Sequence, residues 1–288
     1  MNPPRTSIKQ FTLHLVRSPN GRPPEFVYPY VFRGFFLDMI KDVDPALAAA
    51  LHDEQGIKPY SIQYAFKQFE IELTINLFTH GIARPLYNYL VGLQDMSISL
   101  GKTTYTMFRV GMKEIGYRDL LEHSHPVRAC RVQFLSPTYF NSDTHSFNIK
   151  LPLPGLVFKN LAQMWNEFTA HQVDVDVPRF IDWVTKSVEI SSFDMRTVPV
   201  TLGKGRSISG MQGWLKYRLG DSIEGFERWV DCLLDLARYT NVGGNRTAGM
   251  GMIRYLPSTD PQPRFEHVVR DESLKDRHDE PVPSINDD

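Results

Sequence analysis

The sequence has few cysteines and no long hydrophobic run, and each shortage excludes a class of protein. Its only cysteines are Cys130 and Cys232, too few for a disulfide framework or a four-cysteine zinc site. No stretch approaches the roughly 18 uncharged apolar residues of a membrane span. The first residues also lack the apolar segment of a secretory signal. We therefore expect a cytoplasmic protein in a reducing compartment, with no membrane partner.

The composition is that of a folded protein whose charge is unevenly distributed. Apolar residues make up 42% of the chain, which excludes disorder for the chain as a whole. At about 150 residues per domain, the length favours two domains. Residues 257–288 hold nine acidic and four basic residues, which leaves 28 basic and 24 acidic residues in 1–256. This mildly basic body permits a polyanion as partner without requiring one.

The hydrophobic pattern repeats one order of elements twice. In the first half it predicts a strand at 8–17, a helix at 31–51 broken near Asp44-Pro45, strands at 59–66 and 69–77, a helix at 81–93, and one or two strands within 96–116. In the second half it predicts a strand at 128–135, a helix at 154–168, strands at 186–196 and 207–219, a helix at 223–239, and a last strand at 250–256.

This βαββαβ order predicts an α+β protein with two tandem ferredoxin-like domains, similar to RNA-recognition motifs. We expect the domains to cover residues 1–125 and 126–256. Residues 257–288 are acidic and rich in proline, and we expect a flexible tail there.

A glycine-rich loop, NVGGNRTAGMG, occupies residues 241–251. It follows a predicted helix and precedes a strand, which is the reverse of a dinucleotide fingerprint, and no Gly-Lys-Ser/Thr closes it as in a P-loop. Two interpretations stay open. The loop either makes a turn with positive φ and a close backbone approach, or it brings bare amides and Arg246 to an RNA backbone.

The helix end and loop at 237–255 (ARYTNVGGNRTAGMGMIRY) resemble the C-terminal motif of CRISPR-associated RAMP proteins, and in particular the endoribonucleases that cut CRISPR repeat RNA. Segments 132–141 (VQFLSPTYFN), 154–168 and 208–219 (ISGMQGWLKYRL) follow the order of that family. Near the N-terminus, Leu51-His52 and then residues 56–61 (GIKPYS) match the place where many members keep a catalytic histidine. The resemblance spans residues 8–256.

The resemblance implies two ferredoxin-like domains and metal-independent cleavage of precursor CRISPR RNA within each repeat, with no cofactor. The ribose 2′-hydroxyl attacks the adjacent phosphorus and expels the 5′-oxygen, which leaves a 2′,3′-cyclic phosphate or 3′-phosphate and a 5′-hydroxyl. His52 is the first candidate for proton transfer, because the unperturbed pKa of histidine is near 6.5. Lys58 is the candidate for stabilising negative charge on the phosphorane, and Tyr30 is a third catalytic candidate. Each also has an ordinary structural interpretation: a solvated helix-end histidine, a solvated lysine and a core tyrosine.

Basic residues on predicted loops and on one strand face form a candidate RNA-binding set, together with the glycine loop. The set is Lys204 and Arg206 around Gly205, Lys216 and Arg218 along a strand, and Gly243, Gly244, Arg246, Gly249 and Gly251 in the loop. Any one of these cations, taken alone, is also typical of a solvated surface. The implied partner is CRISPR repeat RNA and its crRNA product. Other subunits of an effector complex and a second copy in a homodimer are further candidate partners.

Three other interpretations compete with this one. Asp174 and Asp176 in VDVDV would share a strand face and could hold magnesium, as in a polymerase. Residues 33–36 (RGFF) mimic the start of an RNA-recognition-motif signature, but they open a helical pattern, which favours a place in the core. Finally, a non-catalytic RAMP subunit that only holds crRNA in an effector complex would have the same fold and loop.

Overall fold

The structure is a computed structural model that describes residues 7–18, 27–53, 56–79, 81–142, 146–169, 173–203, 205–221 and 224–258. The predicted tail at 257–288 lies outside these residues, apart from its first two positions. No helix in the described ranges combines the length and apolar character needed to cross a membrane.

The first half forms a five-stranded antiparallel sheet in the order β2-β3-β1-β5-β4. Its elements are β1 (Ser7–Arg17), α1 (Pro29–Val43), α2 (Pro45–Asp53), β2 (Tyr60–Phe66), β3 (Glu70–Leu77), α3 (Ala83–Gly92), β4 (Ser97–Leu100) and β5 (Thr103–Gly116). Without the short hairpin strand β4, this is the strand order of a ferredoxin-like βαββαβ unit. The helix α4 (Tyr117–Glu122) then leads to the second half.

The second half repeats the topology in a four-stranded antiparallel sheet of order β7-β8-β6-β9. Its elements are β6 (Ala129–Thr138), α5 (Pro154–Thr169), α6 (Val177–Ser187), β7 (Val188–Gly203), β8 (Arg206–Leu219), α7 (Phe226–Thr240) and β9 (Ile253–Ser258), with a short 3₁₀ turn at Arg246–Ala248. The predicted α+β fold of two ferredoxin-like units is confirmed. The helix α6 was not predicted.

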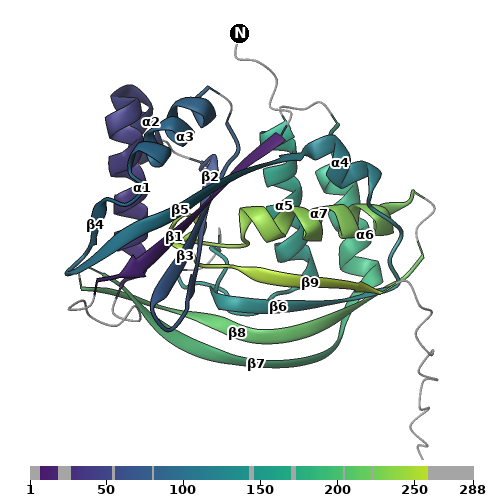
Figure 1. Ribbon diagram of the computed structural model, residues 1–288. Helices are drawn as coiled ribbons and strands as arrows, with labels where there is room; N and C mark the ends of the chain where they lie inside the picture. Colours follow the sequence, from purple (N-terminus) through teal and green to yellow (C-terminus); the bar gives the residue numbers. More distant parts are fainter. Residues whose placement is uncertain are drawn as a thin grey trace, which may run out of the picture.

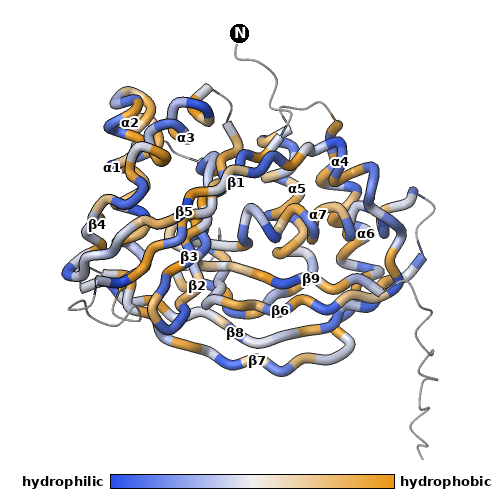
Figure 2. The backbone as a smooth tube through the Cα atoms, in the orientation of Figure 1, coloured by the Kyte–Doolittle hydropathy of each residue, from blue (hydrophilic) through white to orange (hydrophobic). Residues whose placement is uncertain are grey.

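Each sheet buries one face under helices (Figure 1), and polar and apolar residues alternate along the strands (Figure 2). Helices α1 and α3 pack on the first sheet, and α5 and α7 pack on the second. The ends of the first sheet also join the second core, where the rings of Phe78 and Phe168 stack with centroids 4.2 Å apart. Because packing crosses between the halves, a domain boundary at residues 125/126 stays a prediction.

A buried polar network ties the end of α7 to the first sheet. Asn76 is fully buried on β3, and its Nδ2 donates to the Tyr239 carbonyl at 2.9 Å and to Ser61 Oγ at 3.1 Å. Ser61 Oγ also donates to the Tyr239 carbonyl. Gln63 Nε2 donates to the Arg238 carbonyl at 2.7 Å. The glycine loop begins directly after these positions, so the network fixes the loop against β2.

We expect the Asn76→Ala variant to lose about 1–3 kcal/mol of unfolding free energy, because the buried Tyr239 carbonyl would lose a donor. Urea unfolding of the variant and the wild type measures this difference. Gln63→Ala is the matched control, because Gln63 donates to the same helix end from a partly exposed position. Equal losses of unfolding free energy in the two variants would contradict the prediction that the buried donor contributes more than the partly exposed one.

Candidate active site and nucleic-acid interface

A cleft of about 500 Å³ lies where α1, α2 and the start of β8 meet. We call it the His52 cleft, and its lining residues are Tyr30, Arg33, Gly34, Leu37, Asp38, His52 and Arg206. Two of the three predicted catalytic residues, His52 and Tyr30, therefore line one cleft. The predicted RNA-binding residue Arg206 joins them there from the other half of the chain.

Local sequence explains how the helices present His52 and Tyr30. Pro29 occupies the first turn of α1, where its missing N–H costs nothing, and Tyr30 follows it. Asp44 separates α1 from α2, and its Oδ1 accepts a hydrogen bond from the Leu47 amide at 3.0 Å, as a helix cap does. Leu51 in the last turn of α2 is buried in the core, so the next residue, His52, points outward and is exposed.

A second pocket of about 360 Å³ lies beside the glycine loop, and we call it the glycine-loop pocket. Its lining residues are Arg33, Gly56, Ile57, Lys58, Asn141, Asn160, Met164, Gly243, Gly244, Asn245, Arg246 and Thr247. Lys58, the third predicted catalytic residue, lines this pocket and not the His52 cleft. Arg33 lines both cavities and is the residue that links them.

The structure corrects the expectation that Arg246 faces RNA. Its side chain is buried, with Nη1 donating to the Thr240 carbonyl at 2.8 Å and Nη2 to the Lys58 carbonyl at 3.2 Å. Burial lowers the pKa of Arg246 to about 10, which leaves the guanidinium charged at neutral pH. Arg246 therefore fixes the backbone of Lys58 from inside the protein.

The glycines of the loop also have structural roles. Each of the four predicted glycine amides already has an acceptor within the protein, so none of them faces outward for a phosphate. Gly243 donates to Asn160 Oδ1, and Gly244 donates to the Tyr139 carbonyl. Gly249 donates to the Arg246 carbonyl, and Gly251 donates to the Pro137 carbonyl. A Cβ on Gly249 would lie 2.2 Å from the Tyr64 ring, and one on Gly251 would lie 1.9 Å from the Val242 carbonyl oxygen. These contacts fit the interpretation in which the loop turns with positive φ and approaches other backbone closely. The interpretation in which bare amides contact an RNA backbone is wrong in this conformation. Gly249 and Gly251 are buried, whereas Gly243 and Gly244 line the pocket.

Two of the remaining predicted RNA-binding cations, Lys216 and Arg218, lie away from the cleft. Lys204 lies outside the described residues. Lys216 and Arg218 lie near the far end of β8, on the order of 30 Å from Arg206 at about 3.3 Å per residue, and Arg218 forms an ion pair with Glu189. The same outer face holds Arg131, paired with Lys216 in the sheet register, with its guanidinium 4.1 Å from the Trp214 ring centroid. These residues form a surface separate from the cleft.

The magnesium interpretation assumed that Asp174 and Asp176 share one face of a strand, and this assumption is wrong. Both residues precede α6 in a loop, and Asp176 Oδ1 accepts a hydrogen bond from the Arg179 amide as the cap of that helix. Neither aspartate belongs to a group of three metal-ligating side chains in the described part of the chain.

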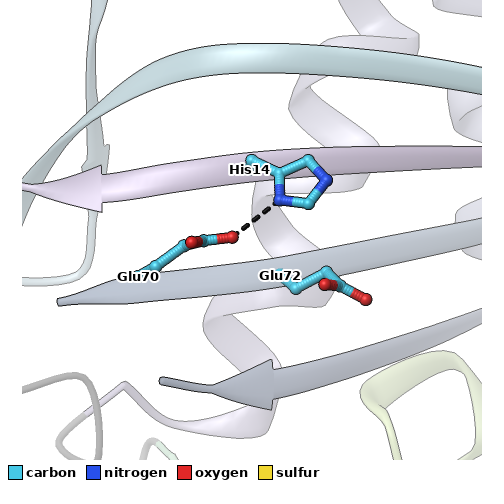
Figure 3. Close-up of side chains that lie close together, drawn as sticks. All are labelled: His14, Glu70 and Glu72. Carbon is cyan, nitrogen blue, oxygen red and sulfur yellow. Dashed lines mark hydrogen bonds and ion pairs between the residues drawn. The ribbon is translucent and has the colours of Figure 1, made fainter. Parts of the chain in front are cut away.

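One such group does exist on the first sheet, where β1 and β3 bring His14, Glu70 and Glu72 together (Figure 3). His14 Nδ1 lies 2.6 Å from Glu70 Oε1. Lys67 Nζ lies 2.8 Å from Glu72 and 3.6 Å from Glu70, so a cation of the protein already neutralises the carboxylates. The hydrogen bond from His14, with Lys67 adding to it, holds the pKa of the Glu70 carboxyl below its usual value. We interpret this group as an ion-pair network.

Sequence reasoning missed the place of Arg33. The expectation that RGFF lies in the core is correct for Phe36, which is fully buried, but Arg33 is only partly buried and lines both cavities. The available signal was helical spacing: Phe32 and Phe36 face the core, and Arg33 follows Phe32 by one position, which turns it away from the centre of that face.

Comparison with known proteins supports the fold, and one family match covers the glycine loop. Residues 132–253 match the family described as CRISPR-associated endoribonuclease Cas6. A Cas6 product complex is 22% identical with a TM-score of 0.74, covering 87% of this chain and 100% of that chain. A Thermus thermophilus Cas6 is 22% identical with a TM-score of 0.67, covering 87% and 99%. An RAMP protein binding different RNA substrates is 15% identical with a TM-score of 0.52, covering 86% and 99%.

A comparison with curated protein sequences finds no match. The resemblance to CRISPR-associated RAMP endoribonucleases is confirmed on two grounds: residues 132–253 carry the sequence pattern of the Cas6 endoribonuclease family, and most of the chain has the fold of solved Cas6 structures.

Proposed function

We propose that this protein cleaves precursor CRISPR RNA within its repeats, without a metal ion, by attack of a ribose 2′-hydroxyl. The observation that carries the proposal is the His52 cleft, in which His52 and Tyr30 lie with the guanidinium-bearing residues Arg33 and Arg206. An imidazole and a phenol can move protons, and guanidinium groups bind phosphate. The match of residues 132–253 to the Cas6 family supports repeat RNA as the substrate.

In the proposed reaction, the 2′-oxygen forms a bond to the adjacent phosphorus and the bond from phosphorus to the 5′-oxygen breaks. One proton leaves the 2′-hydroxyl and one reaches the departing 5′-oxygen, which gives a 2′,3′-cyclic phosphate and a 5′-hydroxyl. His52 serves one of these transfers. Lys58 and Arg33 face the neighbouring pocket, from which they stabilise the negative charge of the phosphorane.

The test is incubation of the purified protein with the repeat RNA of its own CRISPR locus in EDTA. A matched RNA carries one 2′-deoxy sugar at the cleavage site. We expect the first RNA to be cut and the second to be bound but left intact, because it lacks the nucleophile.

The other outcomes are equally informative. Tight binding of both RNAs without cleavage would identify a subunit that only holds crRNA, and would overturn the catalytic proposal. Cleavage that requires added magnesium, or that also cuts the 2′-deoxy RNA, would overturn the 2′-hydroxyl mechanism.

A further inference from the structure

The open face of the second sheet carries basic residues around one aromatic ring. Helices α5, α6 and α7 all lie on the other face of this sheet (Figure 1), where Leu215 of β8 is buried in the core. Because side chains alternate between the two faces of a strand, the neighbours Trp214 and Lys216 point to the open face. We define the basic sheet face as these two residues and those that share their rows in the sheet register: Arg131 and Gln133 on β6 and Arg254 on β9.

The basic sheet face has more positive than negative charge. Arg131 and Arg254 are exposed, and neither forms an ion pair with a carboxylate in the described part of the chain. The Arg131 guanidinium lies 4.1 Å from the Trp214 ring centroid, which keeps this cation over the sheet. Next to these residues, Arg196 and Arg218 add to the positive charge of Arg131, Lys216 and Arg254, and Glu189 and Asp194 oppose it. Cations therefore outnumber carboxylates in this part of the sheet.

The part of the chain that follows β9 has the opposite charge. Residues 259–288 contain nine acidic and four basic residues, a net charge of −5. Five of the nine carboxylates lie within the stretch 271–280 (DESLKDRHDE). The charge of this stretch is therefore complementary to that of the basic sheet face.

The acidic stretch is also joined to the same sheet by a short connection. β9 ends at Ser258, whose partner in the register is Ala129 on β6, two positions from Arg131. Residues 259–270 can span about 40 Å when extended, whereas the four strands of the sheet lie only about 14 Å across, at about 4.8 Å per strand. Attachment to the same chain gives the stretch an effective concentration of about millimolar at the sheet. An interaction too weak to hold two separate molecules together is therefore populated within one chain.

We propose that residues 271–280 bind the basic sheet face of their own chain, with their carboxylates on Arg131, Lys216 and Arg254. A guanidinium offers a carboxylate two parallel N–H donors, which suits the two arginines to this role. The inference does not depend on the proposed function, because the basic sheet face is separate from both cavities. If the proposed function holds, the bound stretch neutralises a surface that attracts any polyanion, and the cations of the His52 cleft are left for RNA.

The test measures how fast trypsin cuts residues 259–288 in the full chain. Trypsin cleaves after arginine and lysine, and this segment offers Arg264, Arg270, Lys275 and Arg277. Mass spectrometry of the intact protein identifies the first cut. At low salt we expect Arg131→Gln/Arg254→Gln to be cut there about two- to tenfold faster than the wild type, because each exposed ion pair contributes little. At about 1 M salt, where the Debye length is about 3 Å, the two proteins should be cut at equal rates.

Arg84→Gln/Lys102→Gln is the matched control, because it removes two exposed cations from the first half of the chain. This control should be cut at the wild-type rate. A second variant, Asp271→Asn/Glu272→Gln/Asp276→Asn, leaves the folded part unchanged and decides the test if thermal unfolding shows that the sheet variant is not folded. Because these substitutions lie close to cleavage sites, its ratio of low-salt to high-salt rates is compared, and we expect this ratio to rise above that of the wild type.

Equal low-salt rates for the wild type and Arg131→Gln/Arg254→Gln would overturn the inference, as would an equally fast cut in the control variant. Weaker binding of the 2′-deoxy repeat RNA by Arg131→Gln/Arg254→Gln, with an unchanged rate of tryptic cleavage, would also overturn it. That result would identify the basic sheet face as an RNA surface.

Discussion

Replacement of His52 by alanine is expected to lower the single-turnover rate of repeat-RNA cleavage by about a hundred- to ten-thousandfold. This is the usual contribution of one positioned proton-transfer group to a reaction rate. Affinity for the 2′-deoxy RNA should be unchanged. His52 is exposed at the end of α2, while its buried neighbour Leu51 anchors the helix, so truncation of the imidazole leaves the core intact. The measurement is the cleavage rate at saturating enzyme, in EDTA.

His123→Ala provides the control for this prediction. His123 follows α4, and its Nδ1 lies 2.7 Å from the Asp119 carbonyl oxygen, away from both cavities. Its removal should leave the cleavage rate unchanged. Cleavage by His52→Ala at the wild-type rate would refute the role of His52 as a proton-transfer group, although it would leave the fold assignment untouched.

The largest stability effect is expected in the glycine loop, from Gly251→Ala. Gly251 has φ +74°, and an added Cβ would lie 1.9 Å from the Val242 carbonyl oxygen. The approach cannot relax easily, because the Val242 amide donates to the Gly251 carbonyl at 2.9 Å. We expect a loss of about 3 kcal/mol or more of unfolding free energy, measured by urea unfolding.

Gly205→Ala separates the two parts of this effect. Gly205 has nearly the same backbone, with φ +72°, but nothing lies within 4 Å of its would-be Cβ. It should therefore lose only the roughly 1–2 kcal/mol that a left-handed backbone costs a residue with a Cβ. Similar losses at the two positions would show that backbone conformation alone, without the close approach, accounts for the Gly251 requirement.

The fold was predictable because its elements follow simple periodicities. Apolar residues alternate along β1 and recur at helical spacing along α7, so most element boundaries are close to those observed. The missed helix α6 shows where the pattern fails. Alternating valines in VDVDV suggested a strand, but Asp176 and Pro178 are a helix cap and a first-turn proline, and this local chemistry decided the structure.

The candidate site was predictable only in part, because contacts between distant segments leave no local pattern. The positions of His52 and Tyr30 came from the family resemblance, and the cleft brings them together. Nothing near Arg246 in sequence indicates that its partners are the Thr240 and Lys58 carbonyls. The same holds for the glycines, whose amides are satisfied by residues on β6 and α5 as well as within the loop.

The hydrogen bond from Arg246 to the Lys58 carbonyl joins positions 188 residues apart, and this separation has a consequence for synthesis. The ribosome releases β1, α1, α2 and β2 before the second half of the chain, and N-terminal units generally fold first. Until Arg246 emerges, the segment around Lys58 has no guanidinium to hold it, and Arg206 and the glycine loop have yet to reach their cavities. On the proposed function, we expect a chain truncated before Arg206 to lack both the complete His52 cleft and the guanidinium that holds the Lys58 backbone.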